Sequence, residues 1–371
     1  MKAIGIILAG NNNRMKELTA KRAVPALPVA GSFRSIDFAL SSMSNSHIQT
    51  VAVLTQYNAR SLNEHLSSSK WWNFGRKQGG LFLFTPTVTA DNSDWYRGTA
   101  DAMYQNIDFL KRRHEPYVII SSGDCVYKLD FNRVLDFHIE KKSDITVVCK
   151  DMMYNDDVSR FGVVRMDDES RITEFDEKPI EALSNTISTG IYVIRRRQLI
   201  ELLEAAAEEN RFDFVNDILV RYKNVKKIYG YKINSYWNNI ADIDAYFKTN
   251  MDFLRPDVRS YFFREEPTIC SKVDDLPPAK FNPGSDISNS LVSSGCIING
   301  SVEDSVLFKQ VFVGKNTTVK NCVILNDVYI GDNVHLENCI VESRGTINPN
   351  TCYCGEDGVM IVKEKNVRYV I

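Results

Sequence analysis

Residues 302–341 contain one six-residue pattern three times: VEDSVL at 302–307, VKNCVI at 319–324 and LENCIV at 336–341. The copies are spaced 17 residues apart, and a related copy, ISNSLV, precedes them at 287–292. An aliphatic residue followed by glycine, any residue and asparagine also recurs at a spacing of 17 residues, as VGKN from 313 and IGDN from 330. Self-similarity at a short fixed period, with short aliphatic runs, is typical of a β-solenoid.

Each coil of such a solenoid has three short faces, with aliphatic side chains pointing inward about every six residues. We therefore expect Val319 and Leu336 to point inward. Glycine or asparagine should turn the corners where the backbone needs a positive φ. Cys322 and Cys339 should stack one coil apart, as small buried side chains rather than redox groups.

Residues 1–253 alternate short β-branched runs with longer helical periods, which favours a mainly parallel α/β sheet. The runs expected to form strands are 3–8, 50–54, 117–120 and 145–148. Residues 99–113 carry Met103, Ile107 and Leu110 on one helical stripe, which predicts a crossover helix. Because Pro277 and Pro278 cannot continue a helix or a central strand, we expect a linker over 254–283 and the solenoid domain over 284–371.

The composition predicts a soluble protein and removes several function classes. The 45 Lys+Arg nearly balance the 47 Asp+Glu, which gives no reason to expect a nucleic-acid or membrane-surface partner. No window approaches the roughly 20 apolar residues of a membrane span, so we expect a cytoplasmic protein. Only Cys352 and Cys354 among the eight cysteines lie close together, and we expect the cysteines to be reduced and mostly structural.

Several segments resemble one family in the same order along the chain. They are LAGNNNRMKELTAKRAVPALPVAGSFRSIDFALS at 8–41, WYRGTADAMYQN at 95–106, SSGDCVYKLD at 121–130, FDEKP at 175–179, STGIYVI at 188–194, YWNNIADIDAY at 236–246 and LPPAKF at 276–281. They resemble ADP-glucose pyrophosphorylase, that is glucose-1-phosphate adenylyltransferase. The resemblance implies a Rossmann-like nucleotidyltransferase domain, then a left-handed parallel β-helix of the hexapeptide type, in a homo- or hetero-tetramer. The implied reaction joins ATP and glucose 1-phosphate to ADP-glucose and pyrophosphate.

The phosphate loop departs from the family pattern. Active members carry G-G-x-G-T-R-L after the first strand, whereas this chain has GNNNRM at 10–15, one residue shorter and with a single glycine. Arg14 aligns with the catalytic arginine of the motif. ATP binding is therefore doubtful, and a plain strand-to-helix turn is the alternative interpretation.

The metal site of the family also departs from its pattern. The resemblance implies two aspartates that hold Mg²⁺, and Asp124 matches the first. Asn239 replaces the second aspartate, and Asn238 replaces the arginine beside it. Mg²⁺ prefers anionic oxygen ligands, so we expect at most a weak Mg²⁺ site at Asp124. Asp242 is expected to point elsewhere and not to substitute.

The implied sugar-phosphate clamp is retained. Glu177 and Lys178 match the family's E-K-P, in which the glutamate contacts sugar hydroxyls and the lysine contacts the phosphate, and Ser188 and Gly190 match its sugar segment. The segment that lines the nucleotide side of the family's cleft is also matched, by Tyr96, Arg97, Gly98 and Thr99. The alternative interpretations are a solvated Glu-Lys pair and, for Gly98 and Thr99, a simple helix start.

Losses at functional positions within an intact scaffold predict a regulatory, catalytically weak or inactive subunit. Val24 adds to these losses, because it replaces the second lysine of the family's K-R-A-K. The pattern is most similar to the GlgD-type subunit, and its partner would be a catalytic GlgC-type paralogue in glycogen biosynthesis. Two alternatives are an active adenylyltransferase with an altered site and a sugar-phosphate-sensing binding protein.

Overall fold

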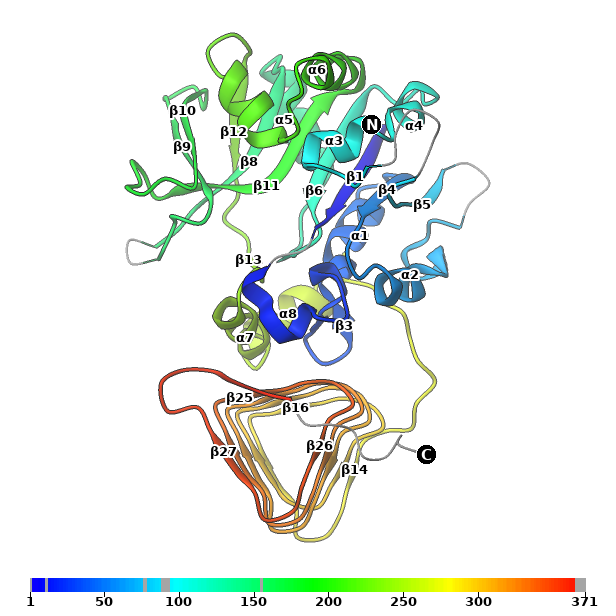
Figure 1. Ribbon diagram of the computed structural model, residues 1–371, viewed down its shortest axis with the longest axis vertical. Helices are drawn as coiled ribbons and strands as arrows, with labels where there is room; N and C mark the ends of the chain where they lie inside the picture. Colours follow the sequence, from blue (N-terminus) through cyan, green and yellow to red (C-terminus); the bar gives the residue numbers. More distant parts are fainter. Residues whose placement is uncertain (1, 11–12, 76–78, 88–93, 154–155, 364–371) are drawn as a thin grey trace.

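The computed structural model describes residues 2–10, 13–75, 79–87, 94–153 and 156–363. It contains an α/β domain and, below it in Figure 1, a triangular β-helix seen end-on. In the described part of the chain, no helix is long and apolar enough to cross a membrane.

The α/β domain is built on a nine-stranded sheet whose main path runs β10-β9-β11-β6-β1-β4-β5. Off this path, β8 pairs with β11, and β12 pairs with β8. The strands are β1 Ala3–Ala9, β4 Thr50–Thr55, β5 Gly80–Phe84, β6 Tyr117–Ser122, β8 Ile145–Asp151, β9 Gly162–Met166, β10 Ile172–Glu177, β11 Thr186–Arg195 and β12 Ile228–Lys232. All four runs predicted as strands are confirmed. The sheet is mixed rather than mainly parallel, because β11 runs antiparallel to both β6 and β8.

Helices cover both faces of this sheet, as in a Rossmann-like domain (Figure 1). They are α1 Ser35–Asn45, α2 Arg60–Leu66, α3 Thr99–Tyr104, α4 Ile107–Lys111, α5 Phe131–Glu140, α6 Arg196–Glu208, α7 Ile243–Asp252 and α8 Pro256–Phe263. Successive residues of β1 point to opposite faces, so Ile7 packs with α1, α2 and α5, while Ile6 packs with α3, α4 and α6.

The helix predicted over 99–113 is divided into α3 and α4. The side chain of Asn106 donates to the Ala102 carbonyl and to the Tyr96 hydroxyl, each at 2.9 Å. A polar side chain that hydrogen-bonds to a carbonyl of the preceding turn competes with the regular backbone hydrogen bonds of a helix, and the helix is interrupted there.

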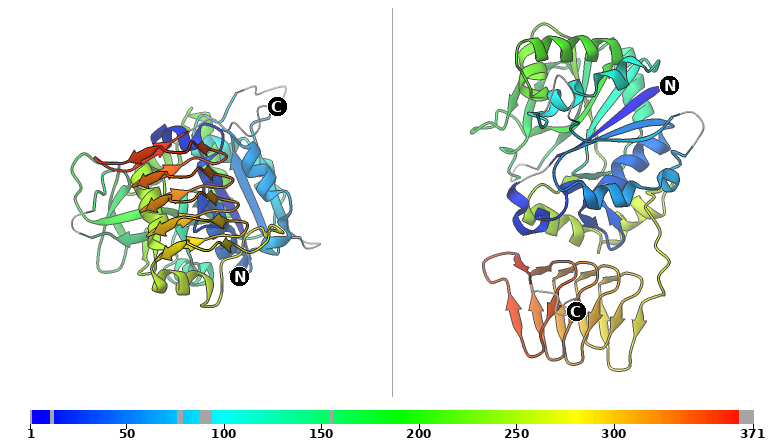
Figure 2. Two further views of the ribbon diagram at one scale, coloured as in Figure 1. Left: turned by 90° about the horizontal axis from the view of Figure 1, so that it is seen from below. Right: turned by 45° about the vertical axis from the view of Figure 1, so that its right-hand side comes forward.

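The C-terminal domain is a left-handed parallel β-helix with three five-stranded sheets. The first sheet contains β14 Lys280–Phe281, β17 Ile297–Ile298, β20 Phe312–Val313, β23 Tyr329–Ile330 and β26 Thr346–Ile347. The second contains β15 Asp286–Ser288, β18 Ser301–Glu303, β21 Thr318–Lys320, β24 His335–Glu337 and β27 Cys352–Cys354. The third contains β16 Leu291–Val292, β19 Val306–Leu307, β22 Val323–Ile324, β25 Cys339–Val341 and β28 Met360–Val362. Figure 2 shows the coils stacked in sequence order.

The predicted coil register is confirmed. Val319 pairs with Leu336 on neighbouring strands, and both side chains are fully buried inside the coils. Cys322 and Cys339 are also buried there. Asn321 and Asn338 turn equivalent corners at φ of 47° and 54°, as expected.

The role predicted for the glycines of the repeat was wrong in part. Gly314 is not among the glycines at positive φ. Instead, a Cβ placed on Gly314 would lie 2.4 Å from the carbonyl oxygen of Gly331 in the next coil. These glycines therefore allow close approach of neighbouring coils rather than a left-handed corner.

The segment expected as a linker, 254–283, contains both a helix and a strand. Helix α8 buries Val258 and Phe262 in a cluster that joins the two domains. An extended stretch follows and leads to β14, the first strand of the β-helix (Figure 1). The shorter elements are β2 Pro28–Val29, β3 Phe33–Arg34, β7 Cys125–Tyr127, β13 Trp237–Asn239, 3-10 segments over 13–19, 24–26 and 69–72, and a π-helical turn over 215–220.

Candidate functional site

Two residues that lie far apart in the sequence meet beside the carboxyl end of β6. Asp124 lies in the two-residue connection between β6 and β7, and β13 pairs antiparallel with β7 so that Asn239 stands opposite Cys125. The amide of Ile240 donates to the Asp124 carbonyl at 2.9 Å and extends the pairing. Asp124 and Asn239, which the motifs align with a pair of aspartates, are therefore neighbours.

The side chains around Asp124 are held in a short polar chain. Ser122 Oγ donates to the Asp124 carboxylate, and Cys125 Sγ lies 3.5 Å from the same oxygen. Asn239 Nδ2 donates to Cys125 Sγ at 3.4 Å, while Asn239 Oδ1 accepts from the amide of Ala241 at 2.9 Å. Burial, together with the charge of Asp124, raises the pKa of Cys125 well above its ordinary value, so the group between Asp124 and Asn239 is a neutral thiol.

This donor set fits Mg²⁺ poorly. Mg²⁺ demands near-ideal octahedral geometry and prefers anionic oxygen ligands, and the motif pattern supplies two carboxylates at this place. Here the described residues bring together one carboxylate and one amide, and the amide oxygen already accepts a backbone hydrogen bond. We derive no reaction step through a metal at this position.

Asn238 points away from Asp124. Its amide lies 3.3 Å from the Tyr236 hydroxyl and 3.5 Å from a carboxylate oxygen of Asp252, on the α7 side of β13. Tyr236 itself donates to that oxygen at 2.7 Å. Because neighbouring strand residues face opposite sides, Asn238 and Asn239 belong to different surroundings.

Asp242 is occupied elsewhere, as predicted. Its carboxylate caps α7 by accepting from the amide of Ala245 at 2.8 Å, and it forms an ion pair with Arg160. It is therefore no substitute for the carboxylate that Asn239 lacks.

The motif analysis missed Arg160. Its guanidinium stacks on the Phe161 ring at 4.9 Å and feels the like charge of Arg14. Burial is the main cause that lowers the pKa of Arg160. Arg14, which the motifs align with a catalytic arginine, thus stands near a second cation beside this site.

Asn11 and Asn12 of the phosphate loop lie outside the described residues. A single arginine before a strand carries no signal in one sequence, which is why Arg160 was not predicted.

The four residues predicted for the sugar-phosphate clamp lie on β10, the turn after it, and β11. Lys178 adopts a left-handed φ of 52°, and its amide donates to the Phe161 carbonyl at 3.0 Å. Its ammonium lies 3.1 Å from a carboxylate oxygen of Glu177, with 60% of the lysine side chain exposed and 18% of the glutamate. A non-glycine residue held at positive φ is uncommon and marks a constrained position.

Strand β11 connects this clamp to Asp124. Ser188 Oγ donates to the Tyr192 hydroxyl at 3.3 Å, and Gly190, at φ of 74°, follows on the same strand. A Cβ at Gly190 would lie 3.5 Å from the Cβ of Ser122, whose hydroxyl bonds to Asp124. The structure therefore places Gly190 of the predicted sugar segment beside Ser122, and so near Asp124.

The segment predicted for the nucleotide side is fixed by structural contacts. The amide of Tyr96 donates to Gln56 Oε1 at 2.6 Å, and Arg97 stacks on the Phe212 ring at 3.9 Å while pairing with Asp101 at 3.3 Å. Gly98 allows close approach, because a Cβ there would lie 2.3 Å from the Phe212 carbonyl oxygen.

Helix α3 begins at Thr99, as predicted, and the Thr99 hydroxyl accepts from the amide of Phe214 at 2.9 Å. Beside the segment, Trp95 and Tyr57 form an exposed stacked pair with ring centroids 6.1 Å apart. The motif analysis missed Tyr57, since the stacking partner lies 38 residues away in sequence.

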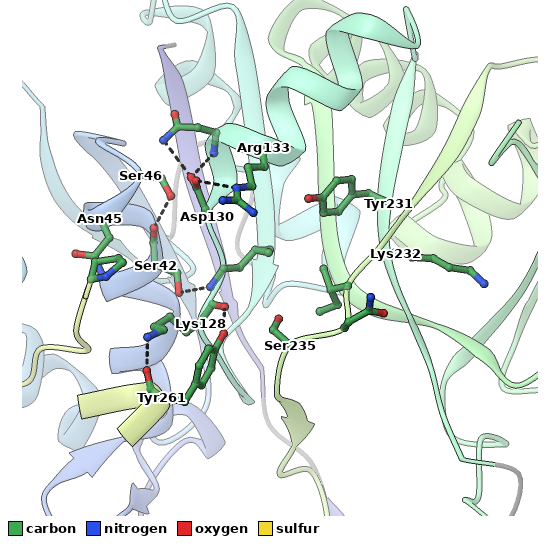
Figure 3. A pocket seen from close by; sticks show the side chains of 15 residues that line it. Ser42, Asn45, Ser46, Lys128, Asp130, Arg133, Tyr231, Lys232, Ser235 and Tyr261 are labelled. Atoms are coloured by element: carbon green, nitrogen blue, oxygen red, sulfur yellow. Dashed lines mark hydrogen bonds and ion pairs between the residues drawn. The ribbon is translucent and has the colours of Figure 1, made fainter. Parts of the chain in front are cut away.

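A cavity of about 530 Å³ lies elsewhere, between α1, α5, α8 and β12 (Figure 3). None of the predicted site residues lines it. The ammonium of Lys128 donates to the Glu265 carbonyl at 3.1 Å, and Arg133 lies 3.7 Å from Asp130. Since these cations already have partners, the cavity offers no distinct anion site.

The fold and the match to known families define the class of the protein. A nucleotidyl transferase model matches residues 4–255, and a model for the GlmU-like C-terminal hexapeptide domain matches residues 277–361. The chain thus combines a nucleotidyltransferase domain with a hexapeptide β-helix.

Its relatives identify the family within that class. Glucose-1-phosphate adenylyltransferase of Geobacillus stearothermophilus is 39% identical over 365 residues, or 97% of this chain and 94% of the relative. The protein of that name from Clostridium novyi (strain NT) is 38% identical over 317 residues, 85% of this chain and 83% of the relative. That from Bacillus subtilis (strain 168) is 36% identical over 322 residues, 86% and 84% of the two chains. The chain belongs to the glucose-1-phosphate adenylyltransferase family, which confirms the family expected from its motifs.

Proposed function

We propose that this chain is a regulatory, catalytically weak or inactive subunit that works with a catalytic paralogue of the GlgC type in glycogen biosynthesis. The observation that supports the proposal is that position 239 holds an asparagine whose side-chain oxygen is already hydrogen-bonded. Its amide replaces a carboxylate beside Asp124, and its oxygen accepts from the Ala241 amide at 2.9 Å. Adenylyl transfer develops negative charge on phosphate oxygens, and a missing metal carboxylate removes stabilisation of that charge.

The size of the expected defect follows from transition-state arithmetic. A loss of about 3–5 kcal/mol of transition-state stabilisation lowers a rate by roughly 10²–10⁴-fold. In this proposal Mg²⁺ and ATP bind weakly at most, and Asp124 is the remaining metal ligand.

Retention of the clamp supports a second part of the proposal, that the chain still binds glucose 1-phosphate. Glu177 is mostly buried beside Ser188 and Tyr192, while the Lys178 ammonium is exposed and 3.1 Å from the Glu177 carboxylate. A phosphate can displace such an exposed intramolecular pair, since surface ion pairs are worth about 0–1 kcal/mol. A chain that binds the sugar phosphate without turning it over suits a regulatory subunit in a homo- or hetero-tetramer.

The test measures ADP-glucose formation by the purified chain alone, by a catalytic paralogue alone, and by the two after co-expression. We expect the chain alone to be at least about 100-fold slower than the mixture. We also expect an altered effector response of the paralogue in the mixture. Turnover by the isolated chain that matches the paralogue would instead support an active enzyme with an altered site.

Calorimetry with glucose 1-phosphate tests the clamp separately from catalysis. The wild-type chain should bind the ligand, and Lys178→Ala should weaken binding by about 10-fold or more, because a charge-assisted contact to phosphate is lost. Lys227→Ala, at an exposed lysine outside the clamp, is the matched control and should leave the affinity unchanged. Equal affinities of the wild type and Lys178→Ala would contradict the proposal that Lys178 contacts the phosphate of the ligand.

A further inference from the structure

Four side chains with metal-binding chemistry gather on the outer surface of the last two coils of the β-helix. Strand β24 pairs in parallel with β27, so that His335 stands opposite Cys352 and Glu337 opposite Cys354. Between them Leu336 is fully buried, and because side chains alternate along a strand, its neighbours on both sides face outward. Ligand atoms of His335, Glu337 and Cys354 all lie within 4.8 Å of one another. Cys352 is not one of these three residues, and its sulfur adjoins them through the sulfur of Cys354.

Two separations inside the cluster match those around one small ion. Zn²⁺ takes four ligands in a tetrahedron, with Zn–S near 2.3 Å and Zn–N or Zn–O near 2.0–2.2 Å, which places two sulfurs about 3.8 Å apart and a nitrogen and an oxygen about 3.4 Å apart. Here the sulfurs of Cys352 and Cys354 are 3.6 Å apart. His335 Nε2 and Glu337 Oε2 are 3.5 Å apart. Both separations agree with shared ligation within a few tenths of an ångström.

The cluster is confined to the end of the β-helix. The corresponding outward positions on earlier strands of this sheet are Asp286 and Ser288, Ser301 and Glu303, and Thr318 and Lys320. These positions contain neither histidine nor cysteine. On the coils before the cluster, the outward pair is an ordinary ion pair, with Lys320 Nζ 3.7 Å from Glu303 Oε2. In the cluster, Glu337 lies beside His335 instead.

We propose that His335, Glu337, Cys352 and Cys354 form a structural site for a thiophilic divalent cation of the Zn²⁺ class, which ties the last coil to the one before it. The ligand chemistry selects the ion, because thiolate and imidazole suit Zn²⁺ whereas Mg²⁺ and Ca²⁺ prefer oxygen ligands. Four protein ligands complete a tetrahedron and leave no open position for a substrate, which is the pattern of a structural rather than a catalytic site.

The position of the cluster at the end of the β-helix indicates that such an ion would stabilise the terminal coil. Strand β27 is the last strand of its sheet, so one side of it has no neighbouring strand in the described chain. Terminal coils of solenoids need capping, and unpaired strand edges invite pairing with other chains. Because two ligands come from each of two coils, the ion would cross-link the terminal coil to its neighbour and oppose fraying of that edge. This site lies apart from Asp124 and does not depend on the function proposed above.

The test uses the full chain, purified under reducing conditions and stripped of metal, with Co²⁺ as a spectroscopic probe and Zn²⁺ as competitor. We expect one equivalent of Co²⁺ to give thiolate-to-metal charge-transfer absorption in the near ultraviolet and tetrahedral bands in the visible, and Zn²⁺ to abolish both. Cys354→Ser and His335→Ala should each weaken Zn²⁺ binding at least about 100-fold, since even the loss of an outer-shell partner typically costs 10–100-fold. Cys270→Ser, which removes another exposed cysteine, is the matched control and should bind as the wild type does.

A second readout covers variants whose folding is in doubt. Zn²⁺ should raise the melting temperature of the wild type and of Cys270→Ser but not that of Cys354→Ser, because binding to the folded state alone stabilises it. Absence of the thiolate absorption in the reduced wild type would overturn the proposal. So would Co²⁺ spectra that Cys352→Ser and Cys354→Ser leave unchanged, or a chain that binds no Zn²⁺ because Cys352 and Cys354 have joined in a disulfide.

Discussion

At the scale of single residues, the contrast between Asn238 and Asn239 shows how strand geometry separates two substitutions that adjoin in sequence. Asn239 donates to Cys125 Sγ, which lies 3.5 Å from the Asp124 carboxylate, whereas Asn238 faces Tyr236 and Asp252. Both side chains are neutral amides, but only Asn239 stands where a carboxylate would add a second negative oxygen ligand beside Asp124. The two positions therefore provide a test and its own control.

Asn239→Asp should increase Mg²⁺-dependent ADP-glucose formation by about 10- to 100-fold, since it restores an anionic ligand worth about 1.4–3 kcal/mol of transition-state stabilisation. Activity should stay below that of a catalytic paralogue, because the single-glycine loop at 10–15 is unchanged and catalytic groups that act together are not additive. Steady-state assays at varied Mg²⁺ measure the gain.

Asn238→Asp is the control on the same strand. It puts a second carboxylate within reach of Asp252, 3.5 Å from the present amide, so it should lower the melting temperature without raising activity. Equal gains from both variants would show that charge in general, and not ligation beside Asp124, limits the rate.

His138 supplies a pH-dependent contribution to stability. Burial, with a smaller effect of Arg195, lowers the pKa of His138 to about 4, and Asp144 opposes this shift. The ring is buried, and its Nδ1 lies 2.8 Å from Thr146 Oγ1. Between pH 6.5 and 4 the unfolded chain binds a proton at this histidine that the folded chain excludes, so stability falls as the pH falls through that window.

At pH 5 this group should cost the folded wild type about 2 kcal/mol relative to pH 7.5. His138→Gln has no such titration and should therefore lose less stability than the wild type over the same interval. Urea unfolding midpoints at the two pH values measure the difference. Parallel losses in the two proteins would mean that His138 is protonated in the folded state.

At the scale of elements, the spacing of apolar residues in the sequence predicted strands, coils and helical stripes. It did not predict where a polar side chain interrupts a helix. The 17-residue repeat predicted the coil register down to Val319 and Leu336, because each coil must place its aliphatic residues inward. The helix expected over 99–113 kept its apolar stripe but broke at Asn106, whose side chain bonds to Ala102 and Tyr96. That break depends on a tertiary contact, and no periodicity reveals it.

The candidate site likewise contains residues that the sequence predicted and residues that it did not. Motifs identified Asp124, Asn239 and the clamp because these residues lie within recognisable segments. The structure brings Asp124, Asn239 and Gly190 close together through β6, β7, β11 and β13. Arg160 lies outside those segments; it forms an ion pair with Asp242 and lies near Arg14. The antiparallel insertion of β11, which makes the sheet mixed, likewise depends on pairing between strands far apart in sequence.

The coil register predicts opposite effects for neighbouring positions of β21. Val319→Asp places an unpaired charge inside the coils and should destabilise the β-helix by more than about 4 kcal/mol, with loss of oligomers that depend on this domain. Thr318→Asp places the same charge on the outer surface and should change stability by less than about 0.5 kcal/mol. Calorimetry with light scattering measures both; a Val319→Asp protein that melts and assembles normally would contradict the register.

At the scale of the whole molecule, the β-helix uses one of its three sheets against its own α/β domain. Val306, Phe308, Val323, Leu325 and Ile340 join a cluster with residues of α7, α8 and the segment from Met15 to Phe38. Figure 1 shows α7 and α8 directly above that side of the triangle. In an oligomer, any subunit contact made by the β-helix would therefore use its two remaining sides or its ends.

One ion pair spans this domain interface and should be strongly context-dependent. Arg22 pairs with Glu342, with side chains 16% and 14% exposed, and Arg22 also lies 3.3 Å from Ser343 Oγ. Removing one partner leaves the other charge mostly buried and unpaired, which typically costs about 3–5 kcal/mol, whereas replacing both with neutral groups of similar size is often close to neutral. The pair should therefore fix how the domains dock more than it stabilises them.

A double-mutant cycle separates these two effects. We expect Arg22→Met and Glu342→Gln each to lower the melting temperature and to expose the 264–279 connection to limited proteolysis. The double variant should recover most of the lost stability, with a coupling energy in the range of 0.5–3 kcal/mol that contacting residues typically show. Arg255→Met, which removes an exposed arginine on the same side of the α/β domain, is the control and should leave both readouts unchanged. If the double variant were as unstable as the sum of the single ones, Arg22 and Glu342 would act independently, and the docking of the two domains would rest on the apolar cluster alone.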